Sequence, residues 1–381
     1  MKKVILATSG MLSLAYLTAC ASPQTTTNNT ADGIETKEIN INRSYTELNV
    51  STAIDVEYSN TASQLILTGS TKYIPYVKVT EQNRKLRIYL ELPNDMQQHI
   101  NAGNIQVVLP TSKALQTIQL SGACRLTGNE IKAEKLYLTA SGACSVEMDF
   151  DIAHSLQANI SGASSLNGQN LKADNLDLSA SGASKVNTDF QITSRMSANV
   201  SGASNFNGAV KAESILMQVS GASHSNSTLS ANSIHLNVSG ASNDNSTISA
   251  PTVNFKLSGN SASTTSITAE QANLNLSGAS DIQGGVKVQE LQLQATSNSF
   301  ANLKGKADHC NAMLSGAAQL SSRSAMLETQ TFHCEASGNS KAYIRCNSKV
   351  TGTANGASTL YIYGNATNQI VTKSAGKVIH K

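Results

Sequence analysis

The sequence predicts an all-β protein: a parallel β-helix solenoid of about 19–20-residue coils, preceded by a cap of β-strands. Three observations predict this fold. A short phrase, Ser-Gly-Ala-Ser or a close variant, recurs at nearly constant spacing between residues 121 and 358, and such self-similarity is typical of solenoids. Apolar and polar residues alternate before each phrase, as in strands with one buried face. The composition is 40% hydrophobic and only 14% charged, which favours a packed core over a disordered chain.

The first 20 residues predict a secretory signal. Two lysines precede an apolar run over residues 4–17, which is too short to span a membrane. The run closes on Leu-Thr-Ala-Cys, which resembles the lipobox of bacterial lipoproteins. The resemblance implies a signal peptide over residues 1–19, acylation of Cys20 and, because residue 21 is not Asp, an outer-membrane lipoprotein of the cell envelope. The alternative is an ordinary signal peptide with an incidental cysteine.

Two further segments precede the repeats. Residues 20–33 comprise the expected lipid-bearing cysteine and a small, polar tether without periodicity. Residues 34–118 carry short apolar or alternating runs separated by Ser, Asn, Gly and Pro, which are strand and turn signals. We expect a strand-only cap here, because an uncovered solenoid end would invite edge-to-edge pairing.

Residues 119–381 form the predicted β-helix. The positions five, three and one residue before each phrase are apolar or small, as with Leu136, Leu138 and Ala140. This period of two predicts a strand with one buried face. Further apolar positions after the phrase lead us to expect three short strands and three corners in each coil.

The central coils depart from the pattern. Five residues after the start of the phrase most coils carry an apolar side chain, but three of them carry Ser225, Asp244 and Ser263. We therefore expect these coils to be thinner or less regular than their neighbours.

Glycine at the second position of the phrase is predicted to form a corner, because a residue without Cβ adopts positive φ without strain. The predicted turn glycines are Gly122, Gly142, Gly162, Gly182, Gly202, Gly221, Gly240, Gly259, Gly278, Gly316, Gly338 and Gly356.

Two cysteines, Cys124 and Cys144, occupy the fourth position of successive phrases. Parallel coils would place their Cα atoms about 4.8 Å apart, within the range of a disulfide, and the compartment beyond the inner membrane is oxidising. Two alternatives therefore remain for these cysteines. They form a disulfide, or they are free thiols in a ladder of small side chains.

Two other cysteines, Cys310 and Cys334, each follow a histidine. Adjacent residues of a strand point to opposite faces, so the thiols should lie inside and the imidazoles outside. The pattern therefore predicts no metal site.

The remaining sequence offers little for catalysis. It has no Ser-His-Asp arrangement, no phosphate-binding loop, no Trp, and no carboxylates expected in register from coil to coil. We predict no enzyme and no cofactor. The formal charge of +3 comes without a basic stripe, so no nucleic-acid partner is expected.

Three parts of the chain, in order, resemble the head GIN domain family, which is described as an auto-transporter adhesin and is common among bacterial lipoproteins. They are the entry over residues 44–124, the Ser-Gly-Ala-Ser coils, and the close over residues 354–381, where Tyr361, Tyr363 and Gly364 match a Tyr-x-Gly turn. The resemblance implies a right-handed β-helix on the cell envelope and no established activity.

The leading hypothesis is a non-catalytic, lipid-anchored envelope protein, an adhesin whose polar rod binds a surface polysaccharide or protein. Its partners would be the membrane, through the lipid, and that surface ligand. The second hypothesis is a structural spacer or self-associating scaffold. The third, a carbohydrate-active enzyme, would require an acidic cleft along the rod.

Overall fold

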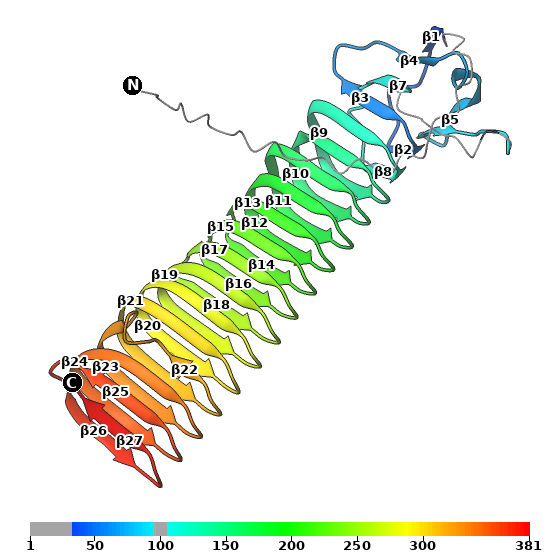
Figure 1. The fold of residues 1–381 in the computed structure, drawn as a ribbon. Helices are drawn as coiled ribbons and strands as arrows, with labels where there is room; N and C mark the ends of the chain where they lie inside the picture. Colours follow the sequence, from blue (N-terminus) through cyan, green and yellow to red (C-terminus); the bar gives the residue numbers. More distant parts are fainter. Residues whose placement is uncertain (1–32, 95, 97–104) are drawn as a thin grey trace, which may run out of the picture.

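The chain forms a long rod of stacked coils with a small cap at one end (Figure 1). The structure is a computed structural model and describes residues 33–94, 96 and 105–381. The expected signal peptide, Cys20 and almost all of the expected tether lie outside the described residues.

Strands make up most of the described chain, with one short 3₁₀ turn, η1, at Ile74–Tyr76. The described part of the cap consists of strands, as expected, with this single three-residue turn between β4 and β5. The strands that precede the long coils are β1 Ile34–Ile39, β2 Glu47–Thr52, β3 Asp55–Ser59, β4 Leu65–Ser70, β5 Val77–Gln82, β6 Lys85–Leu90, β7 Gln106–Pro110 and β8 Thr117–Gly122.

The strands of the coils follow in chain order. They are β9 Arg125–Ala140, β10 Ser145–Ile160, β11 Ser165–Ala180, β12 Lys185–Val200, β13 Asn205–Lys211, β14 Ser214–Val219, β15 His224–Ser230, β16 Ser233–Val238, β17 Asn243–Ser249, β18 Thr252–Leu257, β19 Ala262–Leu276, β20 Asp281–Ala295, β21 Phe300–Leu314, β22 Gln319–Leu320, β23 Leu327–Ala336, β24 Lys341–Ala354, β25 Thr359–Tyr363, β26 Thr367–Thr372 and β27 Lys377–His380.

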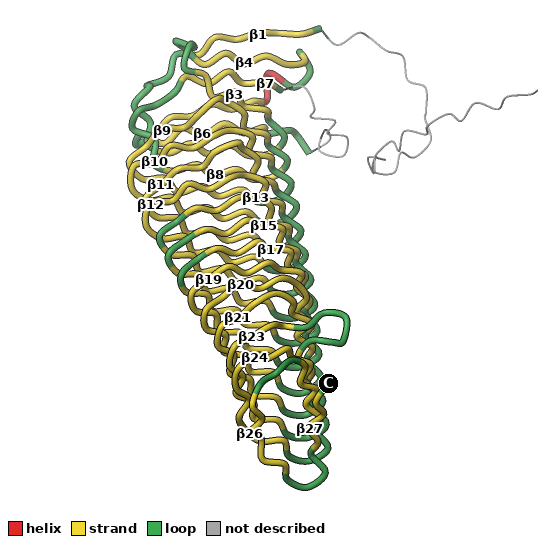
Figure 2. Tube along the Cα trace, turned by 90° about the vertical axis from the view of Figure 1, so that its left-hand side faces the viewer, coloured by secondary structure: helices red, strands yellow, loops and turns green. Residues whose placement is uncertain are grey.

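Each coil lies directly on the previous one in parallel register, so the predicted parallel β-helix is confirmed. In the central coils the strand after the phrase (β13, β15, β17) stacks in one sheet, which we call the first face. The strand before the next phrase (β14, β16, β18) stacks in another, the second face. Figure 2 shows these coils edge-on.

The number of strands in a coil differs from the expected three. Coils such as β10 and β11 hold one continuous strand of 16 residues that bends at register shifts, whereas the central coils hold two strands joined by two-residue links. The third short apolar pair, for example Leu171 and Ala173, is buried as expected but belongs to the continuous strand.

The phrase forms the corner between the second face and the next first face. Every predicted turn glycine has positive φ, from 68° at Gly356 to 87° at Gly122. A Cβ on Gly202 would lie 2.5 Å from the carbonyl oxygen of Gly182 in the coil below. The glycines therefore supply both the backbone conformation and the close approach that lets corners stack.

The fourth residue of the phrase points into the rod. In most coils it is a buried serine, such as Ser204, whose hydroxyl donates to the carbonyl of Ser201 at 2.8 Å. Ser261 and Ser299 make the same bond to the first residue of their own phrases. In this buried column of serines, the hydrogen bond between the fourth and first residues of a phrase thus stabilises the corner that the phrase forms.

The central coils are regular, contrary to expectation. Strands β13, β15 and β17 pair without register shifts, and Ser225, Asp244 and Ser263 point into the core, where each is at most 3% exposed. The coils keep their width because hydrogen bonds among these polar side chains replace apolar contact.

Parallel stacking begins well before residue 119. Strand β2 pairs in parallel with β8, and β3 pairs in parallel with β9. Thr52, the last residue of β2, occupies the corner below Gly122 and has a φ of 77°. Residues 47–59, which we call the first coil, therefore belong to the parallel stack, and β6 and β7 pair in parallel with their other side.

The rest of the cap closes the end of the rod. Strand β4 pairs antiparallel with both β1 and β7, and β5 pairs antiparallel with β6. Among the described residues, no helix is long and apolar enough to cross a membrane.

Candidate binding surfaces

A column of amide side chains runs along the second face. Asn254, Asn273, Gln292 and Asn311 lie in register on successive coils. They point outward because their neighbours along each strand are buried. The Asn273 amide nitrogen donates to the Asn254 side-chain oxygen at 2.9 Å. We call these four residues the second-face amide column.

The second-face amide column lines a shallow hollow of about 570 Å³. A parallel outward column two residues further along the strands adds Asn275 and Gln294, and the C-terminal end of the hollow is closed by His333 and Glu335. Amides both donate and accept hydrogen bonds, so the floor of this hollow matches a neutral ligand rich in hydroxyl or amide groups.

A second amide column lies on the first face. The Asn187 amide donates to Asn167 at 2.9 Å, and the Asn207 amide donates to Asn187 at 2.7 Å. Asn226 and Asn245 continue the register on the next two coils. We call these five residues the first-face amide column.

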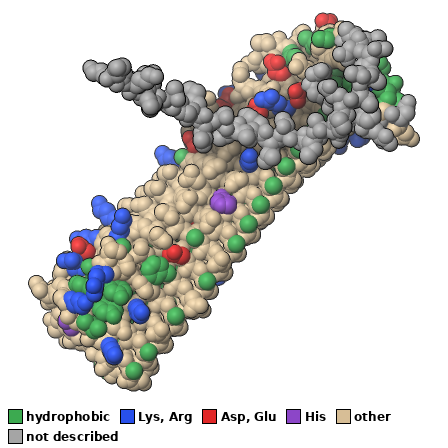
Figure 3. Space-filling view, viewed as in Figure 1, with side chains coloured by type: hydrophobic (Ala, Val, Ile, Leu, Met, Phe, Trp, Pro, Cys, Tyr) green, Lys and Arg blue, Asp and Glu red, His purple; other side chains and the backbone are tan. Residues whose placement is uncertain are grey.

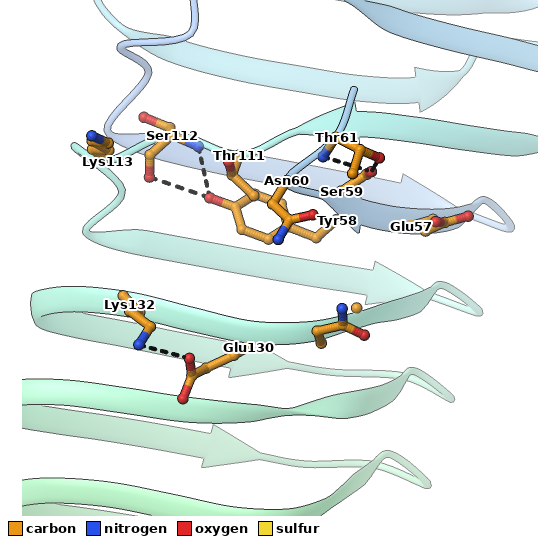
Figure 4. A pocket seen from close by; sticks show the side chains of 12 residues that line it. Glu57, Tyr58, Ser59, Asn60, Thr61, Thr111, Ser112, Lys113, Glu130 and Lys132 are labelled. Carbon is orange, nitrogen blue, oxygen red and sulfur yellow. Dashed lines mark hydrogen bonds and ion pairs between the residues drawn. The ribbon is translucent and has the colours of Figure 1, made fainter. Parts of the chain in front are cut away.

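A hollow near the cap lies where the first coil meets β9, with a volume of about 480 Å³ (Figure 4). Its lining includes two carboxylates, Glu57 and Glu130, and two lysines, Lys113 and Lys132. Figure 4 shows Glu130 turned toward Lys132, with which it forms an ion pair at 3.0 Å. An acid–base pair needs two carboxyl groups free to face one substrate, whereas Glu130 is engaged by Lys132.

At this hollow, tyrosine hydroxyls hold the cap to the first coil. The backbone N–H of Ser112 donates to the Tyr58 hydroxyl at 2.8 Å, and the buried Tyr45 hydroxyl donates to the carbonyl of Pro110 at 2.6 Å. Burial raises the pKa of both phenols. These hydroxyls are structural.

Carboxylates do occur in register, which corrects one expectation. Asp149 pairs with Glu130 on the preceding coil. However, one oxygen of Asp149 accepts bonds from the backbone N–H groups of Gln169 and Asn170, at 2.7 and 3.0 Å. The side chain caps backbone donors at a register shift, so the stacked pair has a structural explanation.

The two cysteines of the corner column lie on adjacent coils, as expected. Cys124 and Cys144 are buried free thiols in the structure, and each donates to the first carbonyl of its own phrase, at 3.2 Å to Ser121 and 3.1 Å to Ser141. The hydrogen bond with Cys144, together with burial, raises the pKa of the Cys124 thiol. The disulfide stays a prediction.

The other cysteines and their preceding histidines point in opposite directions. Cys310 and Cys334 are buried, while His309 and His333 are exposed and contact Thr331 and Thr351 on the next coil. Burial raises the pKa of the Cys310 thiol to about 12, which disfavours the thiolate that metals require. Within the described residues, no cluster of three or more His, Cys, Asp or Glu could hold a metal ion.

Asp244 places a carboxyl group in the core. Its side chain is fully buried and accepts hydrogen bonds from Ser246 at 2.6 Å and Ser263 at 3.1 Å. Ser227 contacts Ser246 at 2.9 Å and extends the network to the preceding coil. Burial raises the pKa of Asp244, and the serine hydroxyls oppose this only in part.

Replacing Asp244 by Asn is expected to raise the free energy of unfolding by about 1–3 kcal/mol at pH 8, because the variant buries no charge. A raised pKa means that the folded chain holds the proton more tightly than the unfolded chain. The stability from protonation is present below the unfolded pKa and is lost as the pH rises through the folded pKa. Urea unfolding from pH 4 to pH 8 should show the advantage of Asp244→Asn growing with pH. The exposed Asp177→Asn should change little, and a pH-independent difference at Asp244 would contradict the account.

Sequence reasoning predicted outward polar residues between the buried ones, but not that amides align in two separate columns or that one column lines a hollow. The signal was present: amides recur at a fixed offset from the phrase. Their alignment into a hollow depends on coil lengths and register, which the structure supplies.

The fold and its surfaces define the class of protein: a parallel β-solenoid with smooth, polar outer faces. The chain belongs to the family described as "Putative auto-transporter adhesin, head GIN domain", which matches residues 44–225 and 252–366. The intervening residues, 226–251, include Asp244. The family description is of an adhesin rather than an enzyme.

Solved structures similar to this chain include proteins from two Parabacteroides species. A "putative adhesin" from Parabacteroides distasonis is 15% identical, with 92% of this chain and 98% of that chain covered and a TM-score of 0.23. A "putative adhesin" from Parabacteroides merdae is 14% identical, with 92% and 97% covered and a TM-score of 0.18. A "putative lipid binding protein" from Parabacteroides distasonis is 10% identical, with 92% and 98% covered and a TM-score of 0.20. A search of curated proteins finds no match.

Proposed function

We propose that this protein is a non-catalytic adhesin of the cell envelope, anchored by lipid at Cys20, whose rod binds a surface polysaccharide. The observation that carries the proposal is the hollow lined by the second-face amide column, which offers neutral donors and acceptors on successive coils. Contacts repeated at each coil suit a polymer, since several weak contacts on one chain add up to useful affinity.

The orientation of the rod agrees with this role. The described chain begins at the cap and ends at the opposite end of the rod (Figure 1). Lipid at Cys20 would hold the cap side toward an outer-membrane surface and leave the long faces accessible. Several acyl chains on one residue give stable anchoring, and metabolic labelling with a fatty acid, compared between wild type and Cys20→Ser, tests the anchor.

The binding role is tested by probing an array of neutral and charged polysaccharides, and a panel of surface proteins, with the full-length chain in detergent. We expect retention on a subset of neutral polysaccharides that changes little between 50 and 300 mM salt, because amides carry no charge. Retention on no polysaccharide, or binding to proteins alone, would contradict the proposal. Turnover of any bound polysaccharide would favour the enzyme hypothesis instead.

A self-associating scaffold is the second candidate, and one observation favours it. Among the described residues, β1 pairs only with β4, and Ile34 at its start is 80% exposed. An open strand edge can pair with another chain. Sedimentation velocity discriminates, since a scaffold should grow with protein concentration whereas an adhesin of fixed size should not.

A further inference from the structure

The end of the rod opposite the cap carries a cluster of aromatic and basic side chains. Figure 3 shows hydrophobic side chains with Lys and Arg around them at this end. We call the cluster the terminal basic patch, and its members are Arg323, Lys341, Tyr343, Tyr361, Lys377 and Lys381.

The register of the last coils brings these residues together. Tyr343 of β24 pairs with Tyr361 of β25, and Lys341 lies two coils from Lys377 in one column. Two coil steps correspond to about 10 Å. Lys341 and Tyr343 share the outer side of their strand, because Ala342 between them is buried.

The two tyrosines lie on the outer side of their strands and are each partly buried. Their rings stack with centroids 4.4 Å apart and planes 9° apart, so each ring covers a face of the other. The edge of an aromatic ring is its positive side. Burial raises the pKa of Tyr343, and the charge of nearby Arg323 opposes this shift. The phenol therefore remains a hydrogen-bond donor at neutral pH.

The positive charge of the patch is largely unopposed. Arg345 lies beside it but is paired with Glu328 at 3.6 Å. Across the part of the chain that the structure describes, no ion pair involves Arg323, Lys341, Lys377 or Lys381. Arg323 extends from the loop between β22 and β23, which projects from the rod (Figure 2), and the Lys381 amine lies 5.9 Å from the centroid of the Tyr361 ring.

Donors and cations without acidic partners fit an anionic ligand, and their repetition at the coil spacing fits a polymer with repeated charges. Gln283 and Asn302 lie on the same face in the coils just before the patch and provide neutral contacts for hydroxyl groups. The column of the two tyrosines continues to Ile379 of β27, which is only partly buried, so a membrane surface is the competing ligand that the test below must separate from a polysaccharide.

We propose that the terminal basic patch is a second binding site, separate from the amide-lined hollow, that takes the carboxylate groups of an acidic polysaccharide. Lys341 and Lys377 contact successive carboxylates, and the hydroxyls of Tyr343 and Tyr361 donate to the same groups. This site adds a charged class of ligand to the neutral one that the second-face amide column would bind.

The test is biolayer interferometry with the immobilised full-length chain in detergent. The probes are polygalacturonate, a neutral galactan of equal length, and phosphatidylglycerol vesicles. We expect the double variant Lys341→Gln/Lys377→Gln to bind polygalacturonate at least tenfold more weakly than wild type at 50 mM salt. Tyr343→Phe, which removes one hydroxyl, should weaken binding about threefold, close to the loss of one hydrogen bond.

The matched control is Lys211→Gln/Lys256→Gln, which removes the same charge from exposed positions outside the patch and should bind within twofold of wild type. Equal losses in both double variants would mean unspecific attraction and would overturn the proposal. So would binding to the vesicles but not to polygalacturonate, or no binding to either. The Lys341→Gln/Lys377→Gln variant retains the amide-lined hollow, so its binding to galactan tests that hollow alone. The proposal for the terminal basic patch and the proposal for the hollow can therefore be rejected independently.

Discussion

Replacing Phe206 by Ala is expected to lower the free energy of unfolding by about 3–5 kcal/mol, the usual cost of removing a buried aromatic ring. Phe206 is fully buried and stacks on Phe190, with ring centroids 5.4 Å apart. Its partner on the next coil is Ser225, which is too small to fill the resulting cavity. Urea unfolding followed by circular dichroism measures the effect.

The control for Phe206 is an aromatic residue on the surface. Tyr137 is 54% exposed, and Tyr137→Ala should change the free energy of unfolding by less than about 0.5 kcal/mol. If the free energy of unfolding of Phe206→Ala lies within about 0.5 kcal/mol of the wild-type value, the interior around Phe206 is not the packed core of the rod.

A single corner substitution, Gly221→Ala, is expected to cost about 2–3 kcal/mol. Gly221 has a φ of 77°, and a Cβ there would lie 2.5 Å from the carbonyl oxygen of Gly202. The left-handed conformation alone costs an alanine about 1–2 kcal/mol, and the close contact requires adjacent coils to move apart. Chemical unfolding of the purified variant gives the magnitude.

One corner of the rod provides a natural comparison. Ser297 occupies the glycine position with a φ of 63°. There the backbone bond from Asn298 to Gly278 is 3.0 Å, against 2.7 Å from Ala222 to Gly202. Ser297→Gly should therefore be neutral or stabilising, by up to about 1 kcal/mol. A loss of stability in Ser297→Gly, or none in Gly221→Ala, would show that the corners do not require glycine.

The sequence predicts the coils well because two local rules agree there. Period-two alternation and a glycine phrase each point to the same boundaries, and Leu136, Leu138 and Ala140 are buried as that pattern requires. At Ser225 and Asp244 two signals conflict. Their position relative to the phrase predicts that the side chains point into the core, whereas their polarity predicts that they lie on the surface. Position prevails because serine hydroxyls satisfy the buried carboxylate, which depends on hydrogen bonds between different coils.

The surfaces were less predictable because they depend on register between coils. The first coil, residues 47–59, is separated from β8 by an inserted cap, so its phrase-like corner at Thr52 carries no local signal. Tyr343 and Tyr361 come from coils of unequal length, and Arg323 reaches them from a loop. A period counted along the chain cannot show that these residues meet.

The central claim is that the phrases build the rod while the amide-lined hollow binds. The most direct test is the triple variant Asn273→Ser/Gln292→Ser/Asn311→Ser, measured for both neutral-polysaccharide binding and urea unfolding. Loss of at least three hydrogen bonds of about 1 kcal/mol each predicts binding weakened more than tenfold, with an unchanged unfolding midpoint. The matched variant Asn187→Ser/Asn207→Ser/Asn226→Ser, from the first-face amide column, should keep both properties. Unchanged binding by the first variant, with its fold intact, would contradict the claim.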